Sequence, residues 1–201
     1  DISAWTVQAD VDDAATYPKA IIDGSNMYVF YRRDNIGEYN NPLAYRKSTD
    51  NGATWGVENT IINFGEGTRI YPGHIELNNE KIHFTWTLYT PSNAKRKQVY
   101  YAYLNTTDEN VYSINGINLG KEITKLEADT YCLVVNTGND ESNHASLHID
   151  SNGYPWIVYI RGAGTNWTYY HIKWNGASWT TPASITTTGN TGKSGKTNDP
   201  N

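Results

Sequence analysis

The stretch STDNGATW, from Ser48 to Trp55, combines a tight turn with the largest side chain of the twenty. Its Asn51-Gly52 step supplies the positive φ angles that a two-residue hairpin turn requires. Asp50 can accept backbone N–H groups inside such a turn. We therefore predict that this stretch joins two antiparallel strands and returns Trp55 to the sheet.

The same layout recurs in three segments, 17–62, 71–120 and 144–186. Each segment holds a strand, a polar turn, a stronger strand, an aromatic strand, a second turn and a closing strand, with apolar residues at period two. Only the region near Ile123 suggests a single helical turn. The predicted turns lie at Asp23-Gly24, Asn51-Gly52, Asn78-Asn79, Asn152-Gly153 and Asn175-Gly176.

A four-stranded antiparallel unit that recurs about every 50 residues indicates an all-β chain built as a β-propeller-like array of blades. The alternative is a β-sandwich, which also joins short strands by Gly and Asn turns. Trp55 and Trp179 follow matching turns, which favours the propeller, and both are predicted to be largely buried.

Three blades fall short of the four to eight that close a ring, so we predict an incomplete propeller over residues 1–186. Further blades of the same protein, self-association, or a cryptic blade in 121–142 would complete it. Open edges are expected at the Trp5 and Ile185 ends. Residues 187–201 are rich in Gly and Thr and read as a flexible tail.

The composition of the 201 residues excludes several classes of protein. Aromatic residues make up 13%, charged residues 18%, and the net charge is -5, so there is no basic footprint for nucleic acid. No apolar run approaches the roughly 18 residues that would span a membrane. The single cysteine, Cys132, excludes an internal disulfide and a cysteine-based zinc site and is predicted to be a buried strand thiol. Low charge with abundant Tyr, Asn and Thr is typical of a secreted, extracellular protein.

Several motifs carry a family resemblance. STDNGATW fits the Asp-box pattern Ser-x-Asp-x-Gly-x-x-Trp, also called a BNR repeat, and residues 17–185 resemble BNR-repeat proteins related to propeller-type polysaccharide lyases of the ulvan lyase kind. The matching stretches are TYPKAIIDGSNMYVFYR (16–32), YPGHIELNNEKIHFTWT (71–87) and HASLHIDSNGYPWIVYI (144–160). The resemblance implies a propeller fold, with the Asp box as a folding element on its outer rim.

A lyase that acts on a uronic acid must neutralise the carboxylate, remove the C5 proton and protonate the leaving oxygen, tasks that suit Arg, His and Tyr. The resemblance implies that such groups lie on inner strands near the axis. The predicted catalytic candidates are His74, His144, Tyr71 and Arg161. The predicted substrate-binding residues are Tyr31, Arg32, Tyr159 and Trp86.

Other polar groups have simpler interpretations. His83 and His148 alternate with apolar residues on their strands, so both are expected in the packing between blades. The basic stretch AKRK at 94–97 is expected to be solvated surface. No catalytic metal or cofactor is predicted. The acidic clusters at 10–13 and 139–141 could hold structural calcium through loop oxygens, although solvated loops are the simpler interpretation.

Two functions follow from the sequence. The first is a secreted propeller that binds or processes an acidic polysaccharide, with lyase activity if further blades complete it. The second is a structural or adhesion segment of a larger assembly without catalysis. Convergence of His74, His144, Tyr71 and Arg161 in one place would favour the first function.

Overall fold

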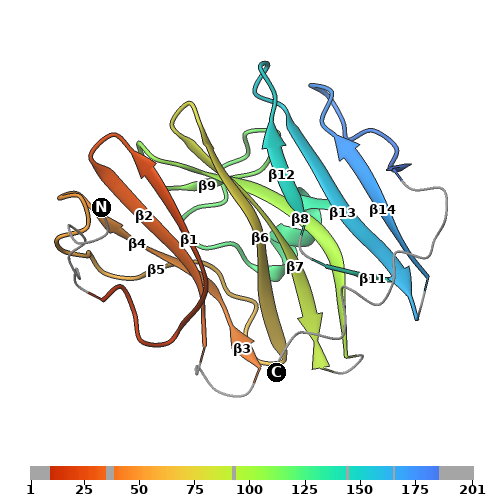
Figure 1. Ribbon diagram of the computed structural model, residues 1–201, viewed down its shortest axis with the longest axis horizontal. Coiled ribbons are helices and arrows are strands. Elements are labelled where there is room, and N and C mark those ends of the chain that lie inside the picture. Colours follow the sequence, from red (N-terminus) through yellow and green to blue (C-terminus); the bar gives the residue numbers. More distant parts are fainter. Residues whose placement is uncertain (1–9, 35–38, 92–93, 144, 165, 186–201) are drawn as a thin grey trace, which may run out of the picture.

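The computed structural model describes residues 10–34, 39–91, 94–143, 145–164 and 166–185, which form three sheets side by side (Figure 1). We call the sheets blades 1, 2 and 3 in chain order. Blade 1 has four antiparallel strands in sequence order: β1 (Ala15–Asp23), β2 (Asn26–Arg33), β4 (Leu43–Ser48) and β5 (Asn59–Ile62).

Blade 2 is the central sheet. Its main strands are β6 (Thr68–Asn78), β7 (Lys81–Thr90), β8 (Lys95–Asn105) and β9 (Val111–Tyr112), each antiparallel to the one before. Two short strands extend it: β10 (Leu133–Val135) also pairs with β8, and β3 (Asn40–Asn41) pairs with β6 in parallel. Blade 2 thus accepts a strand from the segment that builds blade 1.

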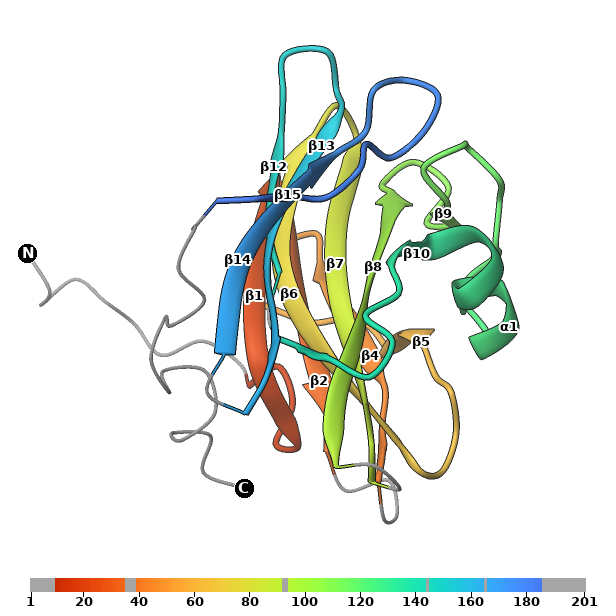
Figure 2. The same ribbon diagram turned by 90° about the vertical axis from the view of Figure 1, so that its right-hand side faces the viewer.

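Blade 3 repeats the same antiparallel order. It consists of β12 (Ser146–Ile149), β13 (Pro155–Ala163), β14 (Asn166–Lys173) and β15 (Ala183–Ser184), and β11 (Glu141–Ser142) adds to β13. The three sheets form an arc rather than a closed ring (Figures 1 and 2). The predicted all-β, incomplete propeller is therefore confirmed, and the sandwich alternative is not.

The segment between blades 2 and 3 is not a cryptic blade. It holds α1 (Lys125–Glu127) and one π-helical turn, η3 (Ala128–Cys132), beside blade 2 (Figure 2). Thr124 caps α1 in a capping box with Glu127, because each side chain bonds the other residue's backbone N–H. Cys132 is buried as expected but ends η3 rather than lying in a strand, and burial raises the pKa of its thiol to about 12.

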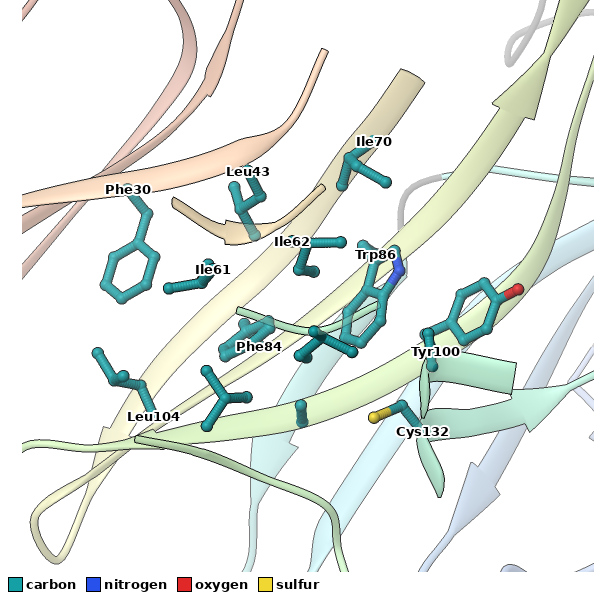
Figure 3. Packing of buried hydrophobic residues seen from close by; sticks show 14 of the residues in the cluster. Phe30, Leu43, Ile61, Ile62, Ile70, Phe84, Trp86, Tyr100, Leu104 and Cys132 are labelled. Carbon is teal, nitrogen blue, oxygen red and sulfur yellow. The ribbon is translucent and has the colours of Figure 1, made fainter. Parts of the chain in front are cut away.

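Strand β8 explains how the blades pack together. Its side chains alternate between the two faces of the sheet. Tyr100, Ala102 and Leu104 join a core that includes Phe30 and Leu43 of blade 1 (Figure 3). Val99, Tyr101 and Tyr103 join a second core with blade 3. Both faces of the central sheet are therefore covered, as expected for a blade with a neighbour on each side.

The far face of blade 3 differs, because three large side chains there remain exposed: Trp156 (37%), Val158 (37%) and Tyr169 (40%). This face carries the apolar residues that a further blade or a second copy would cover. The predicted open edge at Trp5 lies outside the described residues.

The Ser48–Trp55 stretch forms a compact turn between β4 and β5. Ser48 Oγ accepts the N–H of Gly52 at 2.8 Å, and Asp50 Oδ1 accepts the N–H of Thr54 at 2.9 Å. Gly52 has φ +86, and an added Cβ would lie 3.3 Å from Met27 Sδ. Hydrogen bonds from Thr54 and Ser48 lower the pKa of Asp50 to about 2. The carboxylate therefore holds the turn together over the ordinary pH range.

The two tryptophans that follow the turns are less buried than predicted. Trp55 lies between the third and fourth strands of blade 1, and Trp179 lies at the same place in blade 3. Both are partly exposed, so the prediction that they are largely buried was wrong. Trp179 packs edge-on against Trp174, with ring centroids 5.6 Å apart, and against Tyr101, with centroids 5.7 Å apart.

Replacing Gly73 with Ala should destabilise the junction of blades 2 and 3. A Cβ at Gly73 would lie 2.4 Å from Thr85 Oγ1 and 2.6 Å from the carbonyl oxygen of Ala145, so backbone must move. We expect a loss of about 1–3 kcal/mol in the free energy of unfolding, measured by urea denaturation. Gly56→Ala is the control, since its Cβ would meet only the carbonyl oxygen of Lys47, at 3.2 Å. Equal stabilities of the two variants would contradict this packing.

Candidate functional site

The inner strands β1, β6 and β12 lie next to one another and bring equivalent residues of the repeat together. In β1 the Tyr17-Pro18 pair lies within a bulge, and in β6 the Tyr71-Pro72 pair directly precedes one, where the register with the next strand shifts. Tyr17 adopts a φ of 55, in the left-handed region that a bulky residue rarely visits. The rings of Tyr17 and Tyr71 meet edge-on with centroids 5.7 Å apart. The bulges therefore place two tyrosines at the boundary of blades 1 and 2.

Arg32, from β2, lies against both of these rings. Its guanidinium carbon is 4.8 Å from the ring centre of Tyr17 and 4.7 Å from that of Tyr71. Its Nε donates to Asp34 Oδ1 at 3.0 Å and to Thr16 Oγ1 at 3.2 Å. Arg32 is 8% exposed, and its buried Nη1 has no hydrogen-bond partner among the described residues.

Arg96, near the start of β8, approaches Tyr71 from the side of blade 3. Its guanidinium carbon is 3.8 Å from the ring centre of Tyr71, and its Nη1 donates to Asn143 Oδ1 at 2.7 Å. Tyr71 is thus in contact with two guanidinium groups, one from blade 1 and one from blade 2. We call Tyr17, Arg32, Tyr71 and Arg96 the Tyr71 cluster.

The two arginines change the acidity of Tyr71. Burial raises the pKa of its phenol, but hydrogen bonding and charge from Arg96, and then from Arg32, outweigh it and the pKa is lowered. Among the tyrosines of the described residues with a clear shift, Tyr71 is the one shifted downward; burial raises the pKa of others such as Tyr45 and Tyr101. A tyrosine that ionises more readily than usual is suited to proton transfer.

The predicted catalytic residues lie in and around this cluster. His74 is exposed and lies in the bulge of β6; its backbone N–H donates to the carbonyl oxygen of Ala145 at 3.0 Å. His144 lies outside the described residues, but its neighbours Asn143 and Ala145 contact Arg96 and His74. Arg161 donates to Asp140 Oδ2 at 2.7 Å and pairs in the sheet with Ser142, beside Asn143. The structure thus brings Tyr71 and His74 together near the boundary of blades 2 and 3. The guanidinium of Arg161 is instead paired with Asp140, in the segment that leads to Asn143.

Three of the four predicted substrate-binding residues need correction. Only Arg32 joins the cluster, whereas Tyr31 and Trp86 are 0% exposed and Tyr159 is 1% exposed. Tyr31 donates to Glu58 Oε2 at 2.9 Å, and the indole of Trp86 stacks on Tyr100 at 5.1 Å in the core between blades 1 and 2. None of these three rings presents a face on which a sugar could stack.

Three residues near Tyr71 were not predicted as site residues from the sequence: Tyr17, Arg96 and Asn143. The repeated Tyr-Pro pair was a signal for Tyr17, because Tyr71 holds the same position one blade later. Arg96 was expected in a solvated loop, but Lys95–Asn105 is a strand and Arg96 contacts Tyr71. No local pattern marks Asn143 as the partner of Arg96.

The two predicted packing histidines have different surroundings. His83 is buried between blades 2 and 3, whereas His148 is largely exposed with its Nδ1 3.4 Å from Glu76 Oε1.

The two acidic clusters that could have held calcium contain carboxylates paired with arginines. Asp12 forms a salt bridge with Arg46, and Asp140 forms one with Arg161. In the described ranges no three His, Cys, Asp or Glu side chains gather as metal ligands would. Nor does any helix of those ranges have the length and apolar character needed to cross a membrane.

Comparison with known proteins gives consistent matches. A family model described as BNR repeat-containing family member matches residues 1–185. The ulvan lyase PL25 of Pseudoalteromonas sp. (strain PLSV) is 26% identical over 203 residues, which cover 89% of this chain and 41% of the relative. The chain thus spans about two fifths of the length of the curated relatives it matches.

Solved structures match at the level of the fold. A structure of the PL25 ulvan lyase superposes with a TM-score of 0.77 at 22% identity, covering 86% of this chain and 44% of that one. A second structure of that lyase, bound to -[GlcA(1-4)Rha3S]-, gives a TM-score of 0.72 at 22% identity, covering 83% of this chain and 42% of that one.

Proposed function

Because the chain belongs to the BNR repeat-containing family, we propose that it binds an acidic polysaccharide at the Tyr71 cluster and contributes to lyase chemistry on its uronic acid residues. The observation that carries the proposal is that the guanidinium groups of Arg32 and Arg96 both contact Tyr71, whose pKa they lower. The relatives named ulvan lyase, one of them bound to a saccharide that contains glucuronic acid, support the substrate class.

The cluster offers groups for each part of a β-elimination. The arginines can neutralise the uronate carboxylate, which makes the C5 proton more acidic. Tyr71, with its lowered pKa, can take the C5 proton as phenolate or give a proton to the leaving oxygen as phenol. His74, exposed beside it, is the second proton-transfer candidate.

Completion of the site by further blades is part of the proposal. The described residues supply three blades, and the far face of blade 3 leaves Trp156, Val158 and Tyr169 exposed. A polysaccharide is too large to cross a membrane unaided, so we also propose that the protein acts outside the cell.

A second candidate is a binding or adhesion segment without catalysis. The observation that favours it is the pairing of the cluster's charges within the protein, since Asp34 accepts from Arg32 and Asn143 accepts from Arg96. Such pairing can hold a carboxylate-binding surface without turning a substrate over.

Binding of a uronate oligosaccharide to the 201-residue chain tests the function. Isothermal titration with a hyaluronan tetrasaccharide should show binding that weakens about tenfold or more in Arg96→Gln, because a hydrogen bond to a charged group is lost. Lys19→Gln, an exposed lysine on β1, makes the same charge change elsewhere and should bind as the wild type. Equal binding by all three proteins would contradict the proposal.

Product formation then separates the two candidates. Incubation with a panel of uronic acid polysaccharides is followed by the ultraviolet absorption of the unsaturated sugar that β-elimination creates. Absorption growth that requires Tyr71 would support the lyase. Arg96-dependent binding without any product, in the protein completed by its further blades, would favour the non-catalytic segment.

A further inference from the structure

A polar pocket lies at the opposite end of the blade 2–3 junction from Tyr71. It is enclosed by the β6–β7 turn, the β12–β13 turn and the ends of β8 and β14, and it has a volume of about 450 Å³. Ligand pockets span roughly 300–1,000 Å³, so the size suits a sugar or two. Both turns lie at the same end of the molecule (Figures 1 and 2). Asn78 lies seven positions after Tyr71 along β6, about 23 Å of strand, so the two sites are distinct.

The pocket wall combines aromatic rings with amide groups. Tyr101, Tyr103, Tyr154 and Trp174 supply the rings, and asparagines of the two turns and of the 114–116 segment supply amides. The ring of Tyr103 is fixed by parallel stacking on Tyr112, with centroids 5.4 Å apart. Rigid rings beside hydrogen-bonding amides are the groups that bind the apolar face and the hydroxyls of a sugar.

Lys81 sets the charge of the pocket. Its Nζ lies 4.8 Å from the ring centre of Tyr103, and no acid of the described ranges forms a salt bridge with it. His83, also in the wall, is 4% exposed, and its Nδ1 lies 2.5 Å from the hydroxyl oxygen of Tyr101. Burial and then the charge of Lys81 lower the pKa of His83 to about 4, so it is neutral near pH 7. Of the described lining residues, Lys81 alone is charged there.

From this geometry we propose that the pocket is a second glycan site, which binds one sugar ring carrying a single carboxylate or sulfate group at Lys81. The site holds the polymer and performs no chemistry. It rests on the proposed function for its ligand class, but it uses none of the residues of the Tyr71 cluster. A chain with two sites at opposite ends of a blade junction can hold a polysaccharide at more than one point.

The experiment isolates this pocket by working in the Arg96→Gln background. Isothermal titration compares three probes of similar length: a hyaluronan tetrasaccharide, which has carboxylates and no sulfate; a carrageenan tetrasaccharide, which has sulfates and no carboxylate; and neutral maltotetraose. At least one anionic probe should bind in the background, and adding Lys81→Gln should weaken it about tenfold or more. The preferred probe identifies the anionic group.

The outcomes separate this proposal from the function proposed above. Adding Lys19→Gln to the background should leave binding unchanged. Binding that Lys81→Gln does not weaken, maltotetraose that binds as tightly, or no binding of either anionic probe in the Arg96→Gln background would each overturn the second site. Those results leave the role of the Tyr71 cluster standing, because that role is tested by the effect of Arg96→Gln in the otherwise unaltered chain.

Discussion

In the proposed lyase, with its site completed by further blades, replacing Tyr71 with Phe should lower the rate of uronate elimination by about 10²–10⁴-fold, the usual contribution of a positioned acid or base. The substitution removes only the hydroxyl, so the ring can keep its place against the guanidinium groups of Arg32 and Arg96. Growth of the ultraviolet absorption of the unsaturated product measures the rate. Binding of the uronate oligosaccharide should change far less than the rate, because the arginines that face the carboxylate remain.

A matched tyrosine and a pH profile serve as controls for Tyr71. Tyr131 is 42% exposed on η3, and Tyr131→Phe should leave the rate unchanged. Since Arg96 lowers the pKa of Tyr71, Arg96→Gln should raise it, and the limb of the pH–rate profile that reports Tyr71 should move to higher pH. The direction is the same whether Tyr71 acts as base or as acid. A Tyr71→Phe variant with wild-type rate would exclude this residue from proton transfer.

The sequence predicts the blades well because they depend on local chemistry. Period-two alternation and Asn-Gly turns act within a few residues of one another, so the hairpins of blades 1 to 3 are readable from the chain. The π-helical turn that holds Cys132 depends instead on packing against the neighbouring core, to which Ala128 and Cys132 both contribute. The spacing of apolar residues in the sequence therefore does not predict this π-helical turn.

The site is only partly readable for a related reason. Tyr71 and Arg32 lie in sequence motifs that identified them as candidates. The contact between them joins two blades, so the sequence alone does not predict it. Arg96 reaches Tyr71 because a bulge and a positive φ at Gln98 redirect the start of β8, and Asn143 comes from the segment before β12. The sequence wrongly suggested three aromatic residues as substrate-binding: Tyr31, Tyr159 and Trp86. In a blade covered on both faces an aromatic strand residue is core on either side, so alternation alone does not reveal which rings meet solvent.

Replacing Trp86 with Ala should cost about 3–5 kcal/mol in the free energy of unfolding, as for other fully buried large aromatic residues. Trp86 is 0% exposed and lies between Phe84, at 5.6 Å, and Tyr100, at 5.1 Å, in the core shared by blades 1 and 2 (Figure 3). Urea denaturation measures the loss. Trp156→Ala removes the same side chain from the exposed face of blade 3 and should cost much less.

A milder substitution tests why Trp86 stabilises the core. Its Nε1 is buried without a hydrogen-bond partner among the described residues, so the indole N–H is desolvated at a cost and contributes no bond. Trp86→Phe removes that unpaired donor and keeps a ring to stack on Tyr100. If burial and stacking are what Trp86 supplies, Trp86→Phe should lose well under half of what Trp86→Ala loses. Equal losses would show that the full volume of the indole, rather than its ring contact, fixes the distance between blades 1 and 2.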